Sequence, residues 1–434
     1  MYLRGQRFFG LVLFMLSASN ASAALNLQLT QGISNQLPIA IVAFSGAESL
    51  DKEQDVSDVI HNDLKNSGQF KVLAFSSGPH QAAQIRAADW QRKNVDDVII
   101  GTIQRLTDGR YRVNVALVNV AQGKSQTLFQ QQWTVAATQL RRLAHHISDQ
   151  LYEKLIGIRG VFSTRIAYIL VTDKPTRHRQ YSLQVADMDG HNAKPLLTST
   201  QPIMSPAWSH DGKKIAYVSF EKTQPRIYIQ TVSTGKRQLV SEYPGINGAP
   251  AWSPDDKQLA LALSKGAEAP KIYYMDIATR TLKQLTYGLS IDTEPSFSPD
   301  GRSLLFTSDR GGGPQIYQLN LRTKKVQRVT FEGYYNARAS FSADGKMIVI
   351  LNQERGAYNI AVQALGEENI EQIITHSGYD ASPSFAPNGQ MILYESKPGQ
   401  HSFLGMVSTD GRIAIRLPAP QGDVQDPTWS PFMS

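Results

Sequence analysis

The segment EPSFSPDGRSLLFTS at residues 294–308 is the clearest copy of a motif that recurs through the last two-thirds of the chain. Each copy joins a short strand with an aromatic residue, a polar turn and a second, apolar strand. The other copies are SPAWSHDGKKIAYVS (205–219), APAWSPDDKQLALAL (249–263), RASFSADGKMIVILN (338–352) and SPSFAPNGQMILYES (382–396), with a truncated DPTWSPFMS at 426–434. Successive copies begin 44 or 45 residues apart. Strand patterning with this period predicts a β-propeller with one four-stranded blade per repeat.

The two ends of the repeat region are incomplete in complementary ways. Residues 163–200 carry the later part of a repeat but lack its opening strand, whereas the C-terminal DPTWSP supplies only that strand. The economical interpretation is that a strand at 426–431 completes the first blade and closes the ring, which leaves no open sheet edge. The sequence therefore predicts an all-β six-bladed β-propeller over residues 161–434.

Residues 24–160 lack the repeat and alternate strand patterns with helix patterns, so a small N-terminal α/β domain is predicted there. Its expected strands cover 37–44, 70–75, 95–106, 111–120 and 127–135. Apolar residues at helical spacing mark one helix around 56–64 and a last helix from 140 to Gly157. The chain as a whole is therefore expected to be multi-domain, with the α/β domain preceding the propeller.

The first 23 residues have the features of a secretory signal peptide. Arg4 and Arg7 precede an apolar run at 8–16, and Ala21-Ser22-Ala23 forms a small-residue cleavage site. The alternative is a retained anchor, but the run is shorter than the roughly 20 residues that span a bilayer. The chain has no cysteine and a net charge of only +7. These features predict an exported protein of the bacterial periplasm, without disulfides and without a nucleic-acid partner.

Motifs that would indicate catalysis or a bound cofactor are weak or missing. The sequence has neither Gly-x-Ser-x-Gly nor His-Glu-x-x-His. DMDG at 187–190 resembles part of a calcium loop but lacks the downstream glutamate, and a turn explains it. His145 and His146 lie in the last helix, where one is expected to be packed and the other solvated. We therefore expect no catalytic residue, no cofactor and no metal ligand.

The loops that lead into each first strand surround the mouth of the central channel if that strand is innermost in its blade. Loops on a rigid scaffold usually hold function, so this face is the predicted binding face. The predicted contact residues are Met204, Ser205, Gly248, Ala249, Thr293, Glu294, Ala337, Arg338, Ala381 and Ser382, with Lys265 and Arg310 nearby.

With these parts assembled, the chain resembles the TolB family of the Tol-Pal envelope system. The segments that carry the resemblance are PIMSPAWS (202–209), NGAPAWSPD (247–255), TEPSFSPDG (293–301), APNG (386–389), VSTDGR (407–412) and PTWSP (427–431). The resemblance runs over essentially the whole mature chain. One departure is PGINGAP at 244–250, where Ile246 stands at a position that is often histidine in that family, which puts a polar contact there in question.

The resemblance implies a non-enzymatic periplasmic adaptor that supports outer-membrane integrity and envelope constriction during cell division. In that family the propeller mouth receives the lipoprotein Pal, which implies a peripheral association with the outer membrane, and the N-terminal segment binds the C-terminal domain of TolA. A monomer is expected. The implied TolA contacts are Ala24, Leu25, Asn26, Leu27, Gln28 and Leu29. Their alternation of apolar and polar residues suits a strand that adds to a sheet edge, either its own or a partner's.

Two other functions stay open at this point. A periplasmic propeller lyase or glycan hydrolase needs histidines or paired carboxylates that point into the channel. No first strand contains a histidine, and Glu294 and Asp426 lie in distant blades. The remaining alternative is an envelope-binding module with a different ligand.

Overall fold

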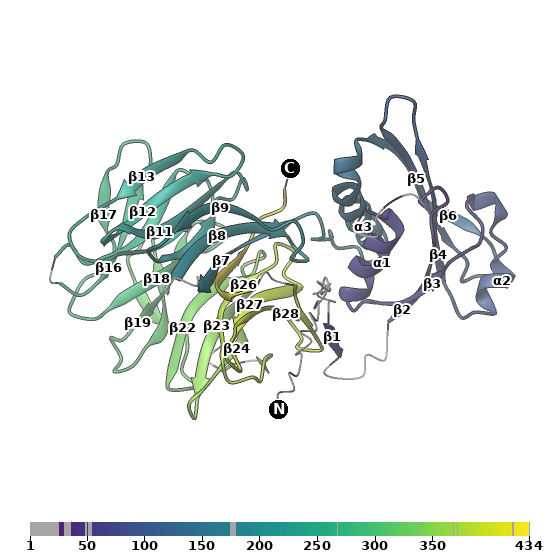
Figure 1. Ribbon diagram of the computed structural model, residues 1–434. Helices are drawn as coiled ribbons and strands as arrows, with labels where there is room; N and C mark the ends of the chain where they lie inside the picture. Colours follow the sequence, from purple (N-terminus) through teal and green to yellow (C-terminus); the bar gives the residue numbers. More distant parts are fainter. Residues whose placement is uncertain are drawn as a thin grey trace, which may run out of the picture.

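The structure is a computed structural model that describes residues 26–29, 36–47, 50, 54–173, 179–266, 268–367, 369–370, 372–418 and 421–433, with only the backbone of 26–29. The signal segment 1–23, Ala24 and Leu25 lie outside these described residues. An α/β domain precedes a six-bladed β-propeller (Figure 1), which confirms the predicted fold class.

The N-terminal domain is built on one five-stranded sheet with the order β3-β2-β4-β5-β6. β2 (Leu37–Val42) pairs in parallel with β3 (Phe70–Phe75) and with β4 (Asp97–Arg105). β5 (Tyr111–Asn119) and β6 (Gln126–Val135) then continue the sheet as an antiparallel meander. The parallel neighbours of β2 require crossover connections, and one helix lies in the chain between β2 and β3 and another between β3 and β4.

Two long helices cover the side of this sheet that faces the propeller, and a short helix lies on the other side (Figure 1). α1 (Val56–Asn66) begins at Asp55, whose carboxylate accepts the Ser57 N–H at 2.9 Å. α3 (Leu140–Ile156) ends at Gly157 in the left-handed conformation. The sequence did not predict α2 (Ala87–Gln91), which is too short to show an apolar stripe. Short 3-10 turns occupy Ala82–Gln84 and Ala137–Gln139.

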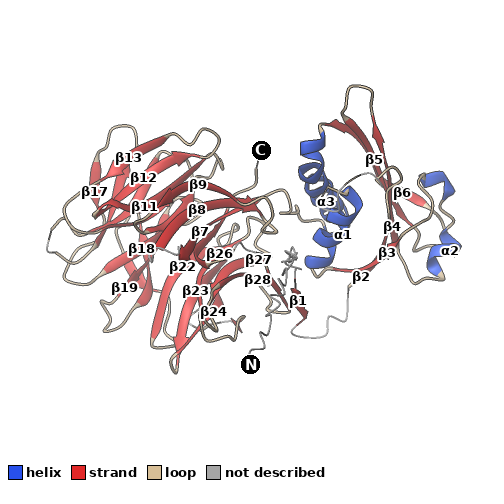
Figure 2. Ribbon diagram, viewed as in Figure 1, coloured by secondary structure: helices blue, strands red, loops and turns tan. Residues whose placement is uncertain are grey.

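The propeller consists of six antiparallel blades (Figure 2). The first blade contains β7 (Arg165–Asp173), β8 (Arg179–Asp187) and β9 (Lys194–Ser199). The second contains β10 (Ile203–Trp208), β11 (Lys214–Lys222), β12 (Gln224–Thr231) and β13 (Arg237–Ser241). The third contains β14 (Asn247–Trp252), β15 (Gln258–Leu263), β16 (Lys271–Asp276) and β17 (Leu282–Gln284). The fourth contains β18 (Asp292–Phe297), β19 (Ser303–Ser308), β20 (Gln315–Asn320) and β21 (Val326–Arg328). The fifth contains β22 (Tyr335–Phe341), β23 (Met347–Glu354), β24 (Ala357–Ala364) and β25 (Gln372–Ile373). The sixth contains β26 (Asp380–Phe385), β27 (Met391–Ser396), β28 (Phe403–Ser408) and β29 (Ile413–Arg416).

The last strand of the chain closes the ring. β30 (Asp423–Trp429) pairs antiparallel with β7, so the first blade has the order β30-β7-β8-β9. Just after β30, the Ser430 hydroxyl accepts the Arg165 N–H at 2.9 Å, and Trp429 donates its indole N–H to the Thr164 hydroxyl at 2.8 Å. Residues more than 260 positions apart in the chain are thereby held in one blade.

The two domains share a hydrophobic core. Leu143 and Tyr152 of α3 are buried in the same apolar cluster as Met188, Met391 and Met406 of the propeller. At the edge of the sixth blade, the N-terminal strand β1 (Asn26–Leu29) pairs antiparallel with β29, beside this junction (Figure 1). The N-terminal segment thus lies on its own propeller, a choice that the sequence had left open.

Candidate functional site

Each first strand of the propeller holds one residue in the left-handed backbone region, directly before the motif proline or, in the fifth blade, before Ala339. None of these residues is glycine, and their φ angles lie between 46° and 54°. A non-glycine residue in this region stores strain of about 1–3 kcal/mol, and such residues gather at functional sites. The six residues are Ser205, Ala249, Glu294, Arg338, Ser382 and Asp426.

A break in strand pairing accounts for this conformation. In every blade the register between the first and second strands shifts across the left-handed residue, for example between Thr293 and Ser296 in the fourth blade. Such bulges re-aim side chains. All six residues line the central channel, a cavity of about 530 Å³. The repeat thus delivers one side chain per blade to the mouth of the channel.

Arg338 joins several blades at this mouth. Its Nε lies 3.1 Å from Glu294 Oε1, its Nη1 lies 2.6 Å from Asp426 Oδ1, and Nη1 also donates to the Ser382 hydroxyl. The other oxygen of Asp426 accepts the Ser205 N–H at 2.9 Å. Glu294 and Asp426, which the sequence analysis treated as separated because they lie in distant blades, therefore share one guanidinium. The two acids meet the same side chain because an arginine is long enough to contact residues of two distant blades at the mouth.

Burial and charge act in opposite directions on the acids of this cluster. Burial, reinforced by the nearby Asp426, raises the pKa of Glu395 to about 7, and Glu395 Oε2 accepts the Asp426 N–H at 2.6 Å. Burial also opposes ionisation of Asp426, but Arg338 outweighs it and holds the pKa of Asp426 below its usual value. The mouth therefore keeps a charged Arg338–Asp426 pair beside a carboxyl that titrates near neutral pH.

The other two basic residues predicted at the mouth are held by internal contacts. Arg310 lies 2.9 Å from the fully buried carboxylate of Asp292, and its guanidinium lies 4.9 Å from the ring centroid of Phe306. Lys265 lies 4.8 Å from the ring centroid of Tyr273. These contacts anchor the loops of the mouth, so neither cation is a freely mobile surface charge.

The remaining predicted mouth residues differ in what they can offer to a partner. Met204 is exposed, whereas Gly248, Thr293 and Ala381 are half-buried. Ala337 is fully buried, because its methyl group lies in the β22–β23 ladder opposite Leu351. Its side chain offers no surface to a partner, which corrects its inclusion among the contact residues. Ser382 is also buried, with its hydroxyl bound by Arg338.

Exposed apolar side chains surround the mouth, and the sequence analysis noted only Ile246 and Met204 among them. Leu289 is 97% exposed and Tyr334 is 81% exposed. Of the ten large apolar side chains that are exposed in the described part of the chain, eight lie in or next to the loops that lead into the first strands. These eight, here called the apolar rim, are Met204, Ile246, Tyr287, Leu289, Ile291, Phe331, Tyr334 and Tyr379. The sequence signal was present in YGLSI (287–291) and FEGYY (331–335), where apolar residues flank glycine in a loop.

Away from the mouth, Asp63, His145 and Asp189 form the one group of described histidine and acidic residues compact enough for a metal ion. His145 Nδ1 lies 2.8 Å from Asp63 Oδ2, and Asp189 also pairs with Arg141. Burial would lower the pKa of His145, but Asp63 and Asp189 raise it to about 9. The carboxylates thus already bind two cations, and the group is an ion-pair link between α1, α3 and the β8–β9 turn. His145 is buried and His146 exposed, as predicted.

Comparison with known protein families divides the chain into two matched regions. The TolB amino-terminal domain family matches residues 25–126, and the TolB beta propeller domain family matches residues 152–433. The chain belongs to the TolB family. This finding confirms the resemblance that the repeat segments indicated.

Individual relatives agree with the family assignment. The Tol-Pal system protein TolB of Coxiella burnetii is 48% identical over 231 residues, which cover 52% of this chain and 53% of that protein. The corresponding protein of Bordetella pertussis is 41% identical over 301 residues, covering 69% of this chain and 66% of that protein. The chain thus spans about half the length of the first of these relatives. The crystal structure of TolB from Acinetobacter baumannii, 40% identical, superposes with a TM-score of 0.85 over 94% of this chain and 100% of that chain.

These relatives establish the broad functional class of the chain. The chain is a propeller protein of the Tol-Pal system, and its family is one of non-catalytic envelope proteins. Within the described residues, no helix is both long and apolar enough to cross a membrane.

Proposed function

We propose that this TolB-family chain is a periplasmic adaptor that binds Pal at the propeller mouth and the C-terminal domain of TolA through its N-terminal segment. The observation that carries the proposal is the apolar rim, because large apolar groups exposed together on one face mark protein-protein contact sites. Through Pal the chain associates peripherally with the outer membrane and supports its integrity during cell division.

The mouth combines two properties that suit a protein partner. The rim contributes tyrosines such as Tyr287, Tyr334 and Tyr379, a residue type enriched among the side chains that dominate binding energy. Inside the rim, the Arg338 cluster holds polar groups in fixed positions, so a partner meets a preorganised surface and loses less entropy on binding. We infer that Pal covers the rim and that its polar groups meet Thr293 and Glu294 at the centre.

The N-terminal segment supports the second contact. Its strand β1 pairs through the backbone with the edge strand β29, and a segment that adds to one sheet edge can add to another. On this proposal TolA competes with the propeller for the segment. Any effect of Pal on TolA binding must then be matched by an equal effect of TolA on Pal binding.

The proposed Pal contact is tested with the variants Leu289→Asp and Tyr334→Asp of the mature chain. Calorimetry measures the affinity of each variant for the purified soluble domain of Pal. We expect each to weaken binding about tenfold or more, since a charge replaces an apolar contact of the rim. Lys213→Asp and Lys346→Asp, beside the turns of the opposite face, are matched controls with exposed side chains and should leave the affinity unchanged. Equal losses in both pairs would contradict the assignment of the face.

The N-terminal contact is tested by removing residues 24–32 and measuring binding of the C-terminal domain of TolA and of Pal separately. TolA binding should be lost while the Pal affinity stays within about twofold. TolA binding that survives the truncation would refute this half of the proposal.

A further inference from the structure

Buried polar residues hold the loops of the apolar rim in blades three to six. They lie at or next to the start of each first strand and are at most 1% exposed: Asn247, Asp292, Asn336 and Asp380. The side chain of each hydrogen-bonds to the loop that precedes it. The Asn247 amide, for example, donates to the Tyr243 carbonyl at 2.6 Å. Since a buried polar group is costly unless it is hydrogen-bonded, each residue favours the loop conformation in which its bonds are made.

The link in the fourth blade is an ion pair. The Asp292 carboxylate is fully buried and lies 2.9 Å from Arg310 Nη2 and 3.4 Å from Lys271 Nζ. It also accepts the Ser290 hydroxyl at 3.2 Å, and the buried Lys271 ammonium donates to the Ser290 carbonyl. Both charged groups thus hold the loop 287–291, which carries three of the eight side chains of the apolar rim.

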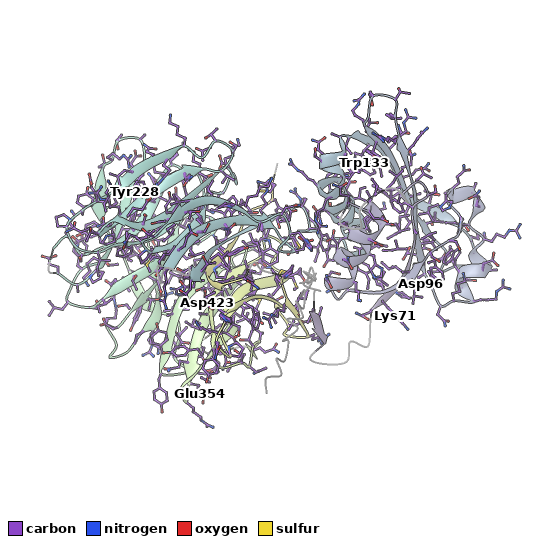
Figure 3. All side chains as sticks on the ribbon, viewed as in Figure 1. Lys71, Asp96, Trp133, Tyr228, Glu354 and Asp423 are labelled. Carbon is purple, nitrogen blue, oxygen red and sulfur yellow. The ribbon has the colours of Figure 1, made fainter. Side chains whose placement is uncertain are left out.

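The fifth blade fastens its rim loop at the same place without charge. Asn336 takes the place of the carboxylate and Gln315 that of the ammonium, each one repeat further along the chain. The Asn336 amide donates to Gln315 Oε1 at 2.9 Å, and the Gln315 amide donates to the Gly333 carbonyl of the loop at 3.2 Å. Figure 3 labels Glu354 at this end of the blade, where β23 ends. Two chemically different pairs therefore hold equivalent rim loops.

We propose that these buried residues, Asp292 foremost, are positioning residues that fix the apolar rim for the partner at the propeller mouth. The inference rests on the proposed function, because the loops affect binding only if the rim is the contact surface. Asp292 is 0% exposed, so its side chain offers no surface to a partner and acts through its loop. A loop that is fixed before binding loses less conformational entropy when the partner docks, which raises the affinity.

The two kinds of link provide matched variants. In the mature chain with Asp292→Asn, the buried Lys271 loses its carboxylate, so the loop 287–291 should loosen. Adding Lys271→Gln rebuilds the uncharged pair of the fifth blade in the fourth. Calorimetry with the purified soluble domain of Pal should show a dissociation constant about tenfold higher for Asp292→Asn. The double variant should bind within about threefold of the unmodified chain, because it restores the link.

Hydrogen exchange measures the loop without any partner. The Ile291 N–H donates to the Asp309 carboxylate at 2.8 Å, so its exchange rate reports on the fixed conformation of the loop. This amide should exchange faster in Asp292→Asn than in the unmodified chain, and slowly again in the double variant.

Two further variants complete the test. Asn336→Ala breaks the link of the fifth blade and leaves no buried charge unpaired, so it serves where Asp292→Asn fails to fold. It should weaken Pal binding about threefold or more. Gln230→Ala is the control, because Gln230 is 2% exposed but its amide donates to the Gly235 carbonyl, in a turn of the opposite face, at 3.1 Å. It should lower the free energy of unfolding and leave the Pal affinity unchanged.

The outcomes separate this inference from the proposed function. A Pal affinity that falls in Leu289→Asp but in neither Asp292→Asn nor Asn336→Ala would overturn the inference and leave the proposed function in place. An equal loss in Gln230→Ala, or a double variant that binds as weakly as Asp292→Asn, would overturn it too. Unchanged affinity in Leu289→Asp would instead contradict the proposed function on which the inference rests.

Discussion

The two faces of the propeller are made from one repeat, yet they place their strain differently. On the face away from the mouth, glycines occupy the left-handed position of most turns between first and second strands, such as Gly301 and Gly345 at φ 68° and 71°, although Asp256 takes this place in the third blade at φ 57°. The preceding aspartates, including Asp344, lie at the surface and cap their own turns. At the mouth, six non-glycine residues occupy left-handed positions, and acids such as Asp426 are largely buried. All six blades thus place a strained non-glycine residue on the face that carries the apolar rim, and this coincidence supports the mouth as the proposed binding site.

The largest expected difference between the faces is in how much the free energy of unfolding falls when one aspartate is replaced. Asp426→Ala leaves the Arg338 side chain, which is 37% exposed, with one carboxylate fewer and removes the acceptor for the Ser205 N–H. Since breaking a fully buried pair costs about 3–5 kcal/mol and losing an exposed pair about 1 kcal/mol or less, we expect a loss of about 3 kcal/mol. Asp344→Ala removes only an exposed turn cap, worth about 1 kcal/mol. Urea unfolding of both variants checks this contrast.

The interpretation of that experiment depends on Arg338. If the loss in Asp426→Ala comes from an unpaired cation, then adding Arg338→Met should recover part of the stability. A double variant as unstable as the sum of the two single variants would contradict the role given to the ion pair.

The sequence was sufficient for the fold because the fold rests on local, repeated signals. The strands around the motif 294–308 and its copies follow from alternation and turns, and the helix 140–156 follows from its apolar stripe. The incomplete first repeat and the extra C-terminal strand could be recognised in the sequence before the structure showed that they pair. The five-residue helix at Ala87–Gln91 carried no comparable signal.

The site was less accessible to sequence reasoning, because its contacts are non-local. Arg338 and Asp426 are separated by 88 residues, and only the closed ring brings them together. The position before the motif proline reads Ser, Ala, Glu, Arg, Ser and Asp, with no glycine to indicate a left-handed backbone. The apolar rim could have been found, since exposed loops rarely carry several large apolar residues. The docking of β1 could not, because its alternating pattern fits any free edge equally well.

A second contrast concerns the pH dependence of stability. The pKa of Glu395 is raised from 4.5 to about 7, so its stabilising contribution is complete below pH 4.5 and is lost as the pH rises through 7. The turn aspartates Asp300 and Asp344 have lowered pKa values, mainly through hydrogen bonds from serines. Their contribution has the opposite sign, since it is present above pH 3.8 and is lost as the pH falls below it.

Glu395→Gln should therefore reduce the change in the free energy of unfolding between pH 4.5 and pH 7 by up to about 3 kcal/mol. Asp344→Asn should lower stability by a constant amount across that interval without changing its slope, and should remove pH dependence only below about pH 3.8. Guanidinium unfolding at a series of pH values measures both. An unchanged slope in Glu395→Gln would show that another group titrates at the mouth.

The smallest expected effects come from the backbone itself, and they should differ in sign between the faces. Ala249 is held at φ 46°, where glycine has no steric penalty, so Ala249→Gly should relieve strain that exceeds the added entropy of the unfolded chain. We expect the free energy of unfolding to rise by about 0.5–1 kcal/mol.

Gly345→Ala forces an alanine to φ 71° on the opposite face. The added Cβ would meet only Pro299, at an ordinary 3.6 Å, so backbone strain alone should lower the free energy of unfolding by about 1–2 kcal/mol. Chemical unfolding at constant pH resolves both values. If Ala249→Gly destabilises the chain as Gly345→Ala does, the mouth does not store strain, and the left-handed positions there lose their significance as a marker of function.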